Sequence, residues 1–109
     1  MIHLTCNSTI LIATQPADFR QGIDGLAALC KQRLNSEPRS GTLFVFINRN
    51  KTMIRVLVYE NNGFWLMTKR LSKGKFLGWP TLNAPITPMN AMHLRKLFSG
   101  HYTPVSITA

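Results

Sequence analysis

One block of the chain, residues 42–80, most limits what this protein can fold into. It contains three runs rich in β-branched and aromatic residues, at 42–47, 52–60 and 64–71. Short polar stretches containing Asn, Lys and Gly separate these runs, and such residues favour tight turns. The pattern therefore predicts three consecutive strands that pair as an antiparallel β-meander.

The apolar residues of this block also indicate how its strands are covered. Every position from Leu43 to Ile47 is apolar, which predicts a central strand buried on both faces, or one face closed by another subunit. In the third run Trp65 and Met67 alternate with Phe64 and Leu66, so the two pairs face opposite sides of the sheet. Trp65 and Met67 then lie on the face that would otherwise be exposed to solvent.

The rest of the chain supplies one more strand and two helices. Residues 8–14 predict a short strand, and apolar residues at helical spacing predict an amphipathic helix over 22–34. Residues 81–86 predict an irregular connector, followed by a second helix that starts at Thr87-Pro88 and stops at Gly100, and a frayed tail over 101–109. The expected class is α+β, in the order β-α-β-β-β-α, within a single domain of 109 residues.

The net charge of the chain is +9, because thirteen Lys and Arg face only four acids. Such an excess favours polyanionic partners, with nucleic acid first and anionic membrane surfaces second. An acidic partner protein that covers the charge is the alternative.

Cys6 and Cys30 do not indicate a disulfide or a metal site, since neither a CxxC motif nor a zinc-ligand spacing with His is present. Cys30 falls on the apolar face of the first predicted helix, where it is expected to be a small buried hydrophobe. We expect no metal and no cofactor. Neither a signal peptide nor a membrane span is predicted, which favours a cytoplasmic protein.

The predicted nucleic-acid contacts are seven cations that lie within the block 42–80. These are Arg49, Lys51, Arg55, Lys69, Arg70, Lys73 and Lys75. A basic β-ribbon can enter a major groove, and its phosphate contacts make binding fall steeply with salt. The alternative is a solvated rim whose Lys residues block edge-to-edge aggregation. Trp65 and Trp79 could stack on bases, although we expect at least one of them in the core.

A second candidate segment contains Asp18, Arg20 and Asp24 around Gly22. A metal-dependent nuclease needs converging carboxylates, and Asp18, Asp24 and Glu60 are the only plausible trio among the four acids of the chain. The favoured interpretation is structural. Asp18 then caps or hydrogen-bonds the turn, Arg20 pairs with an acid, and Asp24 stabilises the start of the helix.

Several motifs together resemble a known family over residues 12–100. Residues 18–26, DFRQGIDGL, are similar to its D-x-R-x-G-[IF]-D-G-L opening, and 41–49 to its G-x-L-F-V-F-x-N-[RK]. Gly63-Phe64, the K-R-L at 69–71, the G-K-F at 74–76 and the W-P at 79–80 continue the match. The family is the small TnpB accessory protein, the second open reading frame of insertion-sequence-sixty-six elements. One position departs from the family pattern: Ser72 stands where an acid usually follows K-R-L.

The resemblance implies a non-enzymatic accessory role in transposing a bacterial element. A separate and larger transposase is thought to perform the strand chemistry in such elements. We therefore expect element DNA to bind the basic ribbon, while apolar surfaces recruit the transposase or a second copy of the chain as a homo-oligomer. The alternative is a protein–protein adaptor that does not touch DNA.

Overall fold

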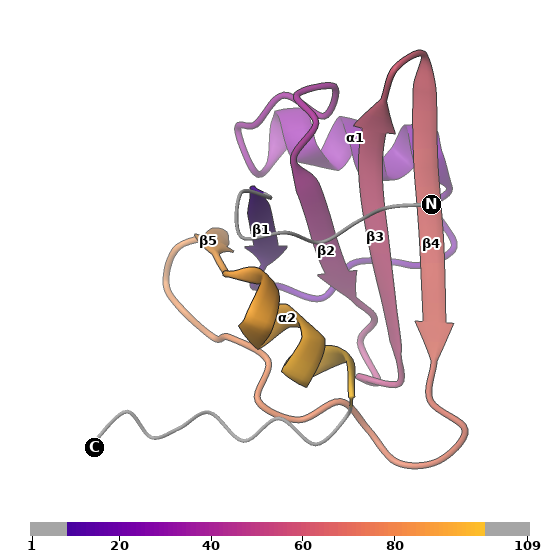
Figure 1. The fold of residues 1–109 in the computed structure, drawn as a ribbon, viewed down its shortest axis with the longest axis vertical. Helices are drawn as coiled ribbons and strands as arrows, with labels where there is room; N and C mark the ends of the chain where they lie inside the picture. The colour runs from indigo at the N-terminus through magenta and orange to yellow at the C-terminus, as the bar shows by residue number, and fades with distance from the viewer. Residues whose placement is uncertain (1–8, 100–109) are drawn as a thin grey trace.

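The computed structural model describes residues 9–99 and shows a mixed five-stranded sheet with one helix on each face (Figure 1). The elements in chain order are β1 (Ile10–Ala13), α1 (Ile23–Gln32), β2 (Leu43–Ile47), β3 (Met53–Glu60), β4 (Gly63–Arg70), β5 (Ile86–Pro88) and α2 (Ala91–Phe98). The strands are arranged in the order β4-β3-β2-β1-β5. The expected α+β class is confirmed. The frayed tail predicted at 101–109 lies outside the described residues.

The predicted meander is confirmed for β2, β3 and β4 and is wrong for the sheet as a whole. Val45 of β2 pairs with Val56 of β3, which pairs with Met67 of β4, and both ladders are antiparallel. However, β1 pairs with β2 in parallel, as in Ile12 opposite Val45. The reason is the helix between them, because a strand, a helix and a second strand form a crossover that brings both strands into the same direction.

The connector predicted over 81–86 is confirmed for residues 81–85, whereas the prediction for residues 86–90 is wrong. Ile86–Pro88 is not a connector and helix start but the strand β5, which pairs antiparallel with β1. Pro88 is compatible with this position because β5 is an edge strand, where a residue can lack an N–H without the loss of a hydrogen bond between strands. The second helix begins three residues later, after Asn90, whose side-chain oxygen accepts a hydrogen bond from the His93 N–H at 2.8 Å.

The sheet has a hydrophobic core on each face, and β2 contributes to both. Val45 and Ile47 pack with residues of α2, whereas Phe44 and Phe46 pack with residues of α1. All five residues of β2 are buried, so the central strand predicted from its apolar run is confirmed. Cys30 is buried on the α1 side, as predicted, and burial raises the pKa of its thiol to about 12.

The two tryptophans have different roles in the fold. Trp79 is only 7% exposed, and its indole N–H donates to the Ala13 carbonyl at 3.0 Å. Trp65 is 48% exposed on β4, and its indole N–H donates to the Glu60 carboxylate. One tryptophan therefore belongs to the core, as expected, and the other stays on the surface. No helix among residues 9–99 has the length and apolar character that crossing a membrane requires.

Candidate nucleic-acid interface

The turn between β2 and β3 displays the first predicted cations, and Asn48 builds it. The Asn48 side-chain oxygen accepts hydrogen bonds from the N–H groups of Thr52 and Met53 at 2.9 and 3.0 Å, and its amide nitrogen donates to the Thr52 hydroxyl. The side chain thus replaces backbone ladder bonds at the end of the hairpin. Arg49 and Lys51 are held on the outside of this turn, and both are exposed.

The segment after β4 docks onto the same turn. The Leu71 N–H donates to the Thr52 carbonyl at 3.0 Å, and the Phe76 N–H donates to the Lys51 carbonyl at 2.8 Å. Both ends of segment 71–76 are therefore tied to the β2–β3 turn, and Phe76 is buried in the core on the α2 side.

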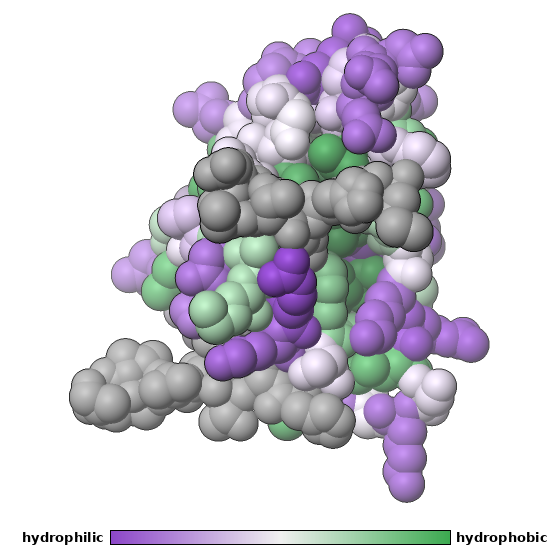
Figure 2. All heavy atoms as spheres, viewed as in Figure 1, coloured by the Kyte–Doolittle hydropathy of each residue, from purple (hydrophilic) through white to green (hydrophobic). Residues whose placement is uncertain are grey.

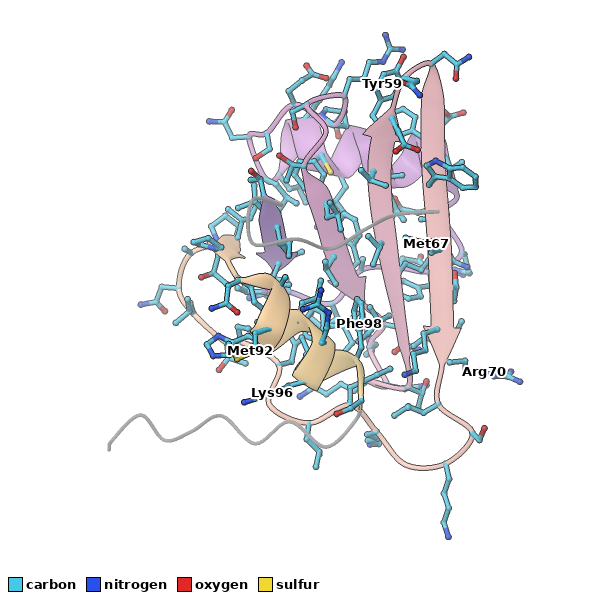
Figure 3. All side chains as sticks on the ribbon, viewed as in Figure 1. Tyr59, Met67, Arg70, Met92, Lys96 and Phe98 are labelled. Carbon is cyan, nitrogen blue, oxygen red and sulfur yellow. The ribbon has the colours of Figure 1, made fainter. Side chains whose placement is uncertain are left out.

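These contacts bring six of the seven predicted cations to one end of the sheet. We call this group the basic end: Arg49, Lys51, Lys69, Arg70, Lys73 and Lys75. Figure 2 shows hydrophilic side chains projecting at the lower right of the molecule, where β4 ends. Arg70, labelled in Figure 3, points away from the sheet there. Arg70 lies opposite Met53 in the ladder, so the end of β4 and the β2–β3 turn are neighbours.

Two of the seven predicted cations already have protein partners. The Lys69 ammonium donates to the Phe98 carbonyl at 2.6 Å, at the carboxyl end of α2. Arg55 donates through Nη1 to the carbonyls of Phe19 and Gln21, at 2.8 and 2.9 Å, and through Nε to the Thr68 hydroxyl. Its guanidinium also stacks over the Phe19 ring at 4.8 Å. These two side chains join elements, and the other five have no hydrogen-bond partner within residues 9–99.

The segment that holds Asp18 and Arg20 has the structural role expected of it. The Asp18 carboxylate accepts hydrogen bonds from the Arg20 backbone N–H at 2.9 Å and from its guanidinium at 2.7 Å. The pKa of Asp18 is lowered from 3.8 to about 2, mainly by the side-chain hydrogen bonds from Arg20 and then by its backbone bond, with a smaller part from the charge of Arg49. Asp24 lies in the first turn of α1, also as expected.

The acids proposed for a nuclease do not assemble. Asp18 is bound to Arg20, and Glu60 lies at the far end of β3 with Trp65. Within residues 9–99 no group of three or more His, Cys, Asp and Glu side chains is placed where it could hold a metal ion. The nuclease alternative therefore has no ligand set in this part of the chain.

An open hollow of about 1000 Å³ lies beside the basic end, on the α1 side of the sheet. Its walls are segment 16–21, one face of α1, the β2–β3 turn and the start of β3. Four arginines line it: Arg20, Arg33, Arg49 and Arg55. The only acid in its wall is Asp18. The hollow therefore brings the Asp18–Arg20 segment together with the basic turn, two candidate sites that lie about thirty residues apart in the sequence.

Sequence reasoning missed this hollow, although one pattern in α1 points to it. The hollow is lined by four residues of α1, Gly25, Ala28, Leu29 and Gln32, and by the C-cap residue Arg33. Their spacing marks a single helix face, and all of them except Leu29 are small or polar. A helix face that is neither fully apolar nor strongly charged indicates a surface that stays accessible beside the core.

Comparisons with known proteins agree with the resemblance. A family model described as IS66 Orf2 like protein matches residues 8–104. The uncharacterized protein y4jC of Sinorhizobium fredii (strain NBRC 101917 / NGR234) is 41% identical over 68 residues, which are 62% of this chain and 58% of that protein. A second uncharacterized protein of the same strain, y4hO, is 34% identical over 94 residues, which are 86% of this chain and 81% of that protein. No solved structure matches the chain.

Proposed function

Because the chain belongs to the family of IS66 Orf2-like proteins, we propose that it is a non-enzymatic accessory protein of transposition that binds DNA phosphates through its basic end. The observation that carries this proposal is the convergence of six cations from two separate sequence regions on one end of the sheet. Five of the seven predicted cations have side chains without a partner in the described part of the chain. Lys and Arg that are free of internal partners can replace the counterions of a nucleic acid.

The distribution of acids supports the same proposal. Glu60 ends β3 at the opposite end of the sheet, and the loop that contains Glu37 lies near that end too, because Arg39 stacks over the Tyr59 ring. Asp18, the acid near the basic end, is neutralised by Arg20. These three acids therefore add little negative charge at the basic end, which favours the approach of a polyanion there.

A duplex-binding titration at several salt concentrations tests the proposal. We expect duplex affinity to fall linearly on a logarithmic salt scale, and Lys73→Gln to reduce that slope by about one, as the loss of one phosphate contact does. Lys31→Gln removes the same charge from an exposed position on α1 outside the basic end and should leave the slope unchanged. If neither duplex nor single-stranded DNA is retained at low salt, the DNA-binding proposal is wrong.

Exposed apolar residues on β4 favour a second candidate, a protein adaptor for the transposase. Trp65 and Met67 are 48% and 39% exposed, and β4 is an edge strand of eight residues whose outer side has no partner within residues 9–99. An edge strand of this length can accept a strand from another protein or from a second copy. Co-purification with the transposase that survives Lys73→Gln but is lost in Trp65→Thr would favour the adaptor.

A further inference from the structure

We propose that the arginine-lined hollow receives one unpaired nucleotide of a DNA strand. Its phosphate lies between Arg33 and Arg49, and its base lies against Phe19, Leu29 and Met53, which are apolar residues in the wall of the hollow. This inference rests on the proposed function, since it specifies which form of DNA the protein prefers. It adds a binding site on the α1 side of the sheet that the predicted basic ribbon does not include.

The four arginines divide into two that shape the hollow and two that are available to a ligand. Arg20 is paired with Asp18, and Arg55 is held by the carbonyls of Phe19 and Gln21. The guanidinium groups of Arg33 and Arg49 have no hydrogen-bond or ion-pair partner within residues 9–99. A guanidinium presents parallel N–H groups that match two phosphate oxygens. The two available arginines come from different elements, so a phosphate between them bridges α1 and the β2–β3 turn.

The apolar residues in the wall of the hollow suit a base better than a second phosphate. Phe19, Leu29 and Met53 line it and are each partly exposed. Arg55 covers one face of the Phe19 ring, so a base would pack on the part of the ring that stays exposed and on the neighbouring apolar side chains, regardless of its sequence. Gln32 and Asn50 also line the hollow, and their amide groups can hydrogen-bond the edge of an exposed base. About 1000 Å³ is at the upper end of the volumes that enclose a small ligand.

A paired nucleotide would not use these features. The bases of a duplex are stacked inside it, so a duplex that touched the rim of the hollow would offer only its phosphates to the arginines. The apolar wall residues and the amide groups would then remain uncovered. An unpaired nucleotide, at a single-stranded tail or an extruded position, fits both parts of the hollow.

The position of the hollow connects it to the basic end. Arg49 lines the hollow, while the carbonyl of Lys51, two residues later, holds the segment that carries Lys73 and Lys75. A strand that leaves a duplex bound at the basic end therefore reaches the hollow across one turn. This arrangement predicts tighter binding to a duplex with a single-stranded tail than to a blunt duplex.

The test compares blunt and tailed duplexes of equal length by fluorescence anisotropy. We expect Arg33→Gln to weaken binding of the tailed duplex about tenfold, which corresponds to the loss of one charge-assisted contact, with blunt-duplex affinity changed by less than about twofold. Lys31→Gln removes the same charge two residues away on α1, outside the hollow, and should change neither affinity.

A second variant separates the shape of the hollow from its charge. Ala28→Leu keeps every charge but fills part of the hollow, and it should weaken binding of the tailed duplex with the melting temperature and blunt-duplex affinity retained. If Ala28→Leu has no effect, or if Arg33→Gln weakens both duplexes equally, no nucleotide enters the hollow. Arg33-dependent binding of an acidic transposase peptide without any preference for tailed DNA would also overturn the inference.

These outcomes are distinct from a failure of the proposed function. Duplex binding that depends on Lys73, with no preference for a tail, would remove only the nucleotide site. Absence of any DNA binding at low salt would remove both.

Discussion

Lys51 occupies a backbone conformation that is unfavourable for its residue type. Its φ is +61°, in the left-handed region where a Cβ atom costs roughly 1 to 2 kcal/mol. Glycine adopts this region freely, so fold stability alone would favour glycine here. A lysine at such a position suggests that its side chain is used, which agrees with the proposed contact to phosphate.

Lys51→Gly is therefore expected to stabilise the protein while weakening DNA binding. The free energy of unfolding should rise by up to about 1 kcal/mol, because strain is relieved at some cost in chain entropy. The salt slope of duplex binding should fall by about one. Asn61→Gly is a matched control, since Asn61 has a φ of +59° at the opposite end of the sheet. It should leave binding unchanged. Urea unfolding and anisotropy measure the two effects, and unaltered binding of Lys51→Gly would exclude Lys51 from the interface.

The pKa of Asp18 gives a second prediction, which concerns the wall of the hollow. We expect an NMR titration to give a pKa of about 2 for the Asp18 carboxyl, and Arg20→Gln to return it toward 3.8, because Arg20 supplies the dominant hydrogen bonds. The pKa is lower in the folded state, so this interaction stabilises the fold above about pH 4 and is lost as the pH falls toward 2. Asp18 therefore stays ionised and bound to Arg20 at neutral pH. A wild-type pKa near 3.8 would show that the pair does not form.

Among the elements, those whose evidence is local could be predicted from sequence, and those that depend on distant partners could not. The apolar run from Leu43 to Ile47 indicates a strand buried on both faces wherever it is placed. β5 gives no such indication, because three residues that include Pro88 form a strand only when β1 is available to pair with them. The parallel pairing of β1 with β2 follows from the α1 crossover, which the β-α-β order of the first three elements already indicates.

The candidate site likewise has features that could be predicted from the sequence and features that depend on distant partners. The Lys and Arg residues of the basic end are evident in the sequence, since composition and turn residues are local properties. Their convergence depends on hydrogen bonds between residues 51–52 and 71–76. The roles of Arg55 and Lys69 as links between elements were equally hidden, because their carbonyl partners lie 29 to 36 residues away in the chain.

Gly25 in α1 allows a close approach that shapes the hollow. A Cβ at this position would lie 2.8 Å from the Cβ of Gln21, whose carbonyl accepts a hydrogen bond from Arg55. Glycine-to-alanine changes inside a helix ordinarily stabilise by about 1 kcal/mol, whereas overpacking costs about 1 to 3 kcal/mol.

We therefore expect Gly25→Ala to lower the free energy of unfolding by about 1 kcal/mol, the net of these two effects. Urea denaturation measures the change. Gln21→Gly in the same chain removes the opposing Cβ, so the double variant should recover the lost stability. A more stable Gly25→Ala protein would show that Gln21 moves aside without cost.

For the whole molecule, we expect the position of the charges to influence DNA binding more than the net charge does. β3 joins the β2–β3 turn to the turn after Glu60, and its eight residues span about 25 Å. The Debye length is about 8 Å at physiological ionic strength. The charges of Glu37 and Glu60 at the opposite end of the sheet are therefore screened from a polyanion bound at the basic end.

Two double variants test this dependence on position: one removes two positive charges and the other removes two negative charges. Lys73→Gln with Lys75→Gln removes two charges from the basic end, and it should weaken duplex binding at least about tenfold near 0.05 M salt and lower the salt slope by about two. Glu37→Gln with Glu60→Gln removes two acids at the other end, and it should strengthen binding less than about threefold at physiological salt because of screening. The glutamine at position 60 keeps an acceptor for the Trp65 indole N–H. If both variants changed affinity equally in opposite directions, net charge would govern binding, and the basic end would not be a site.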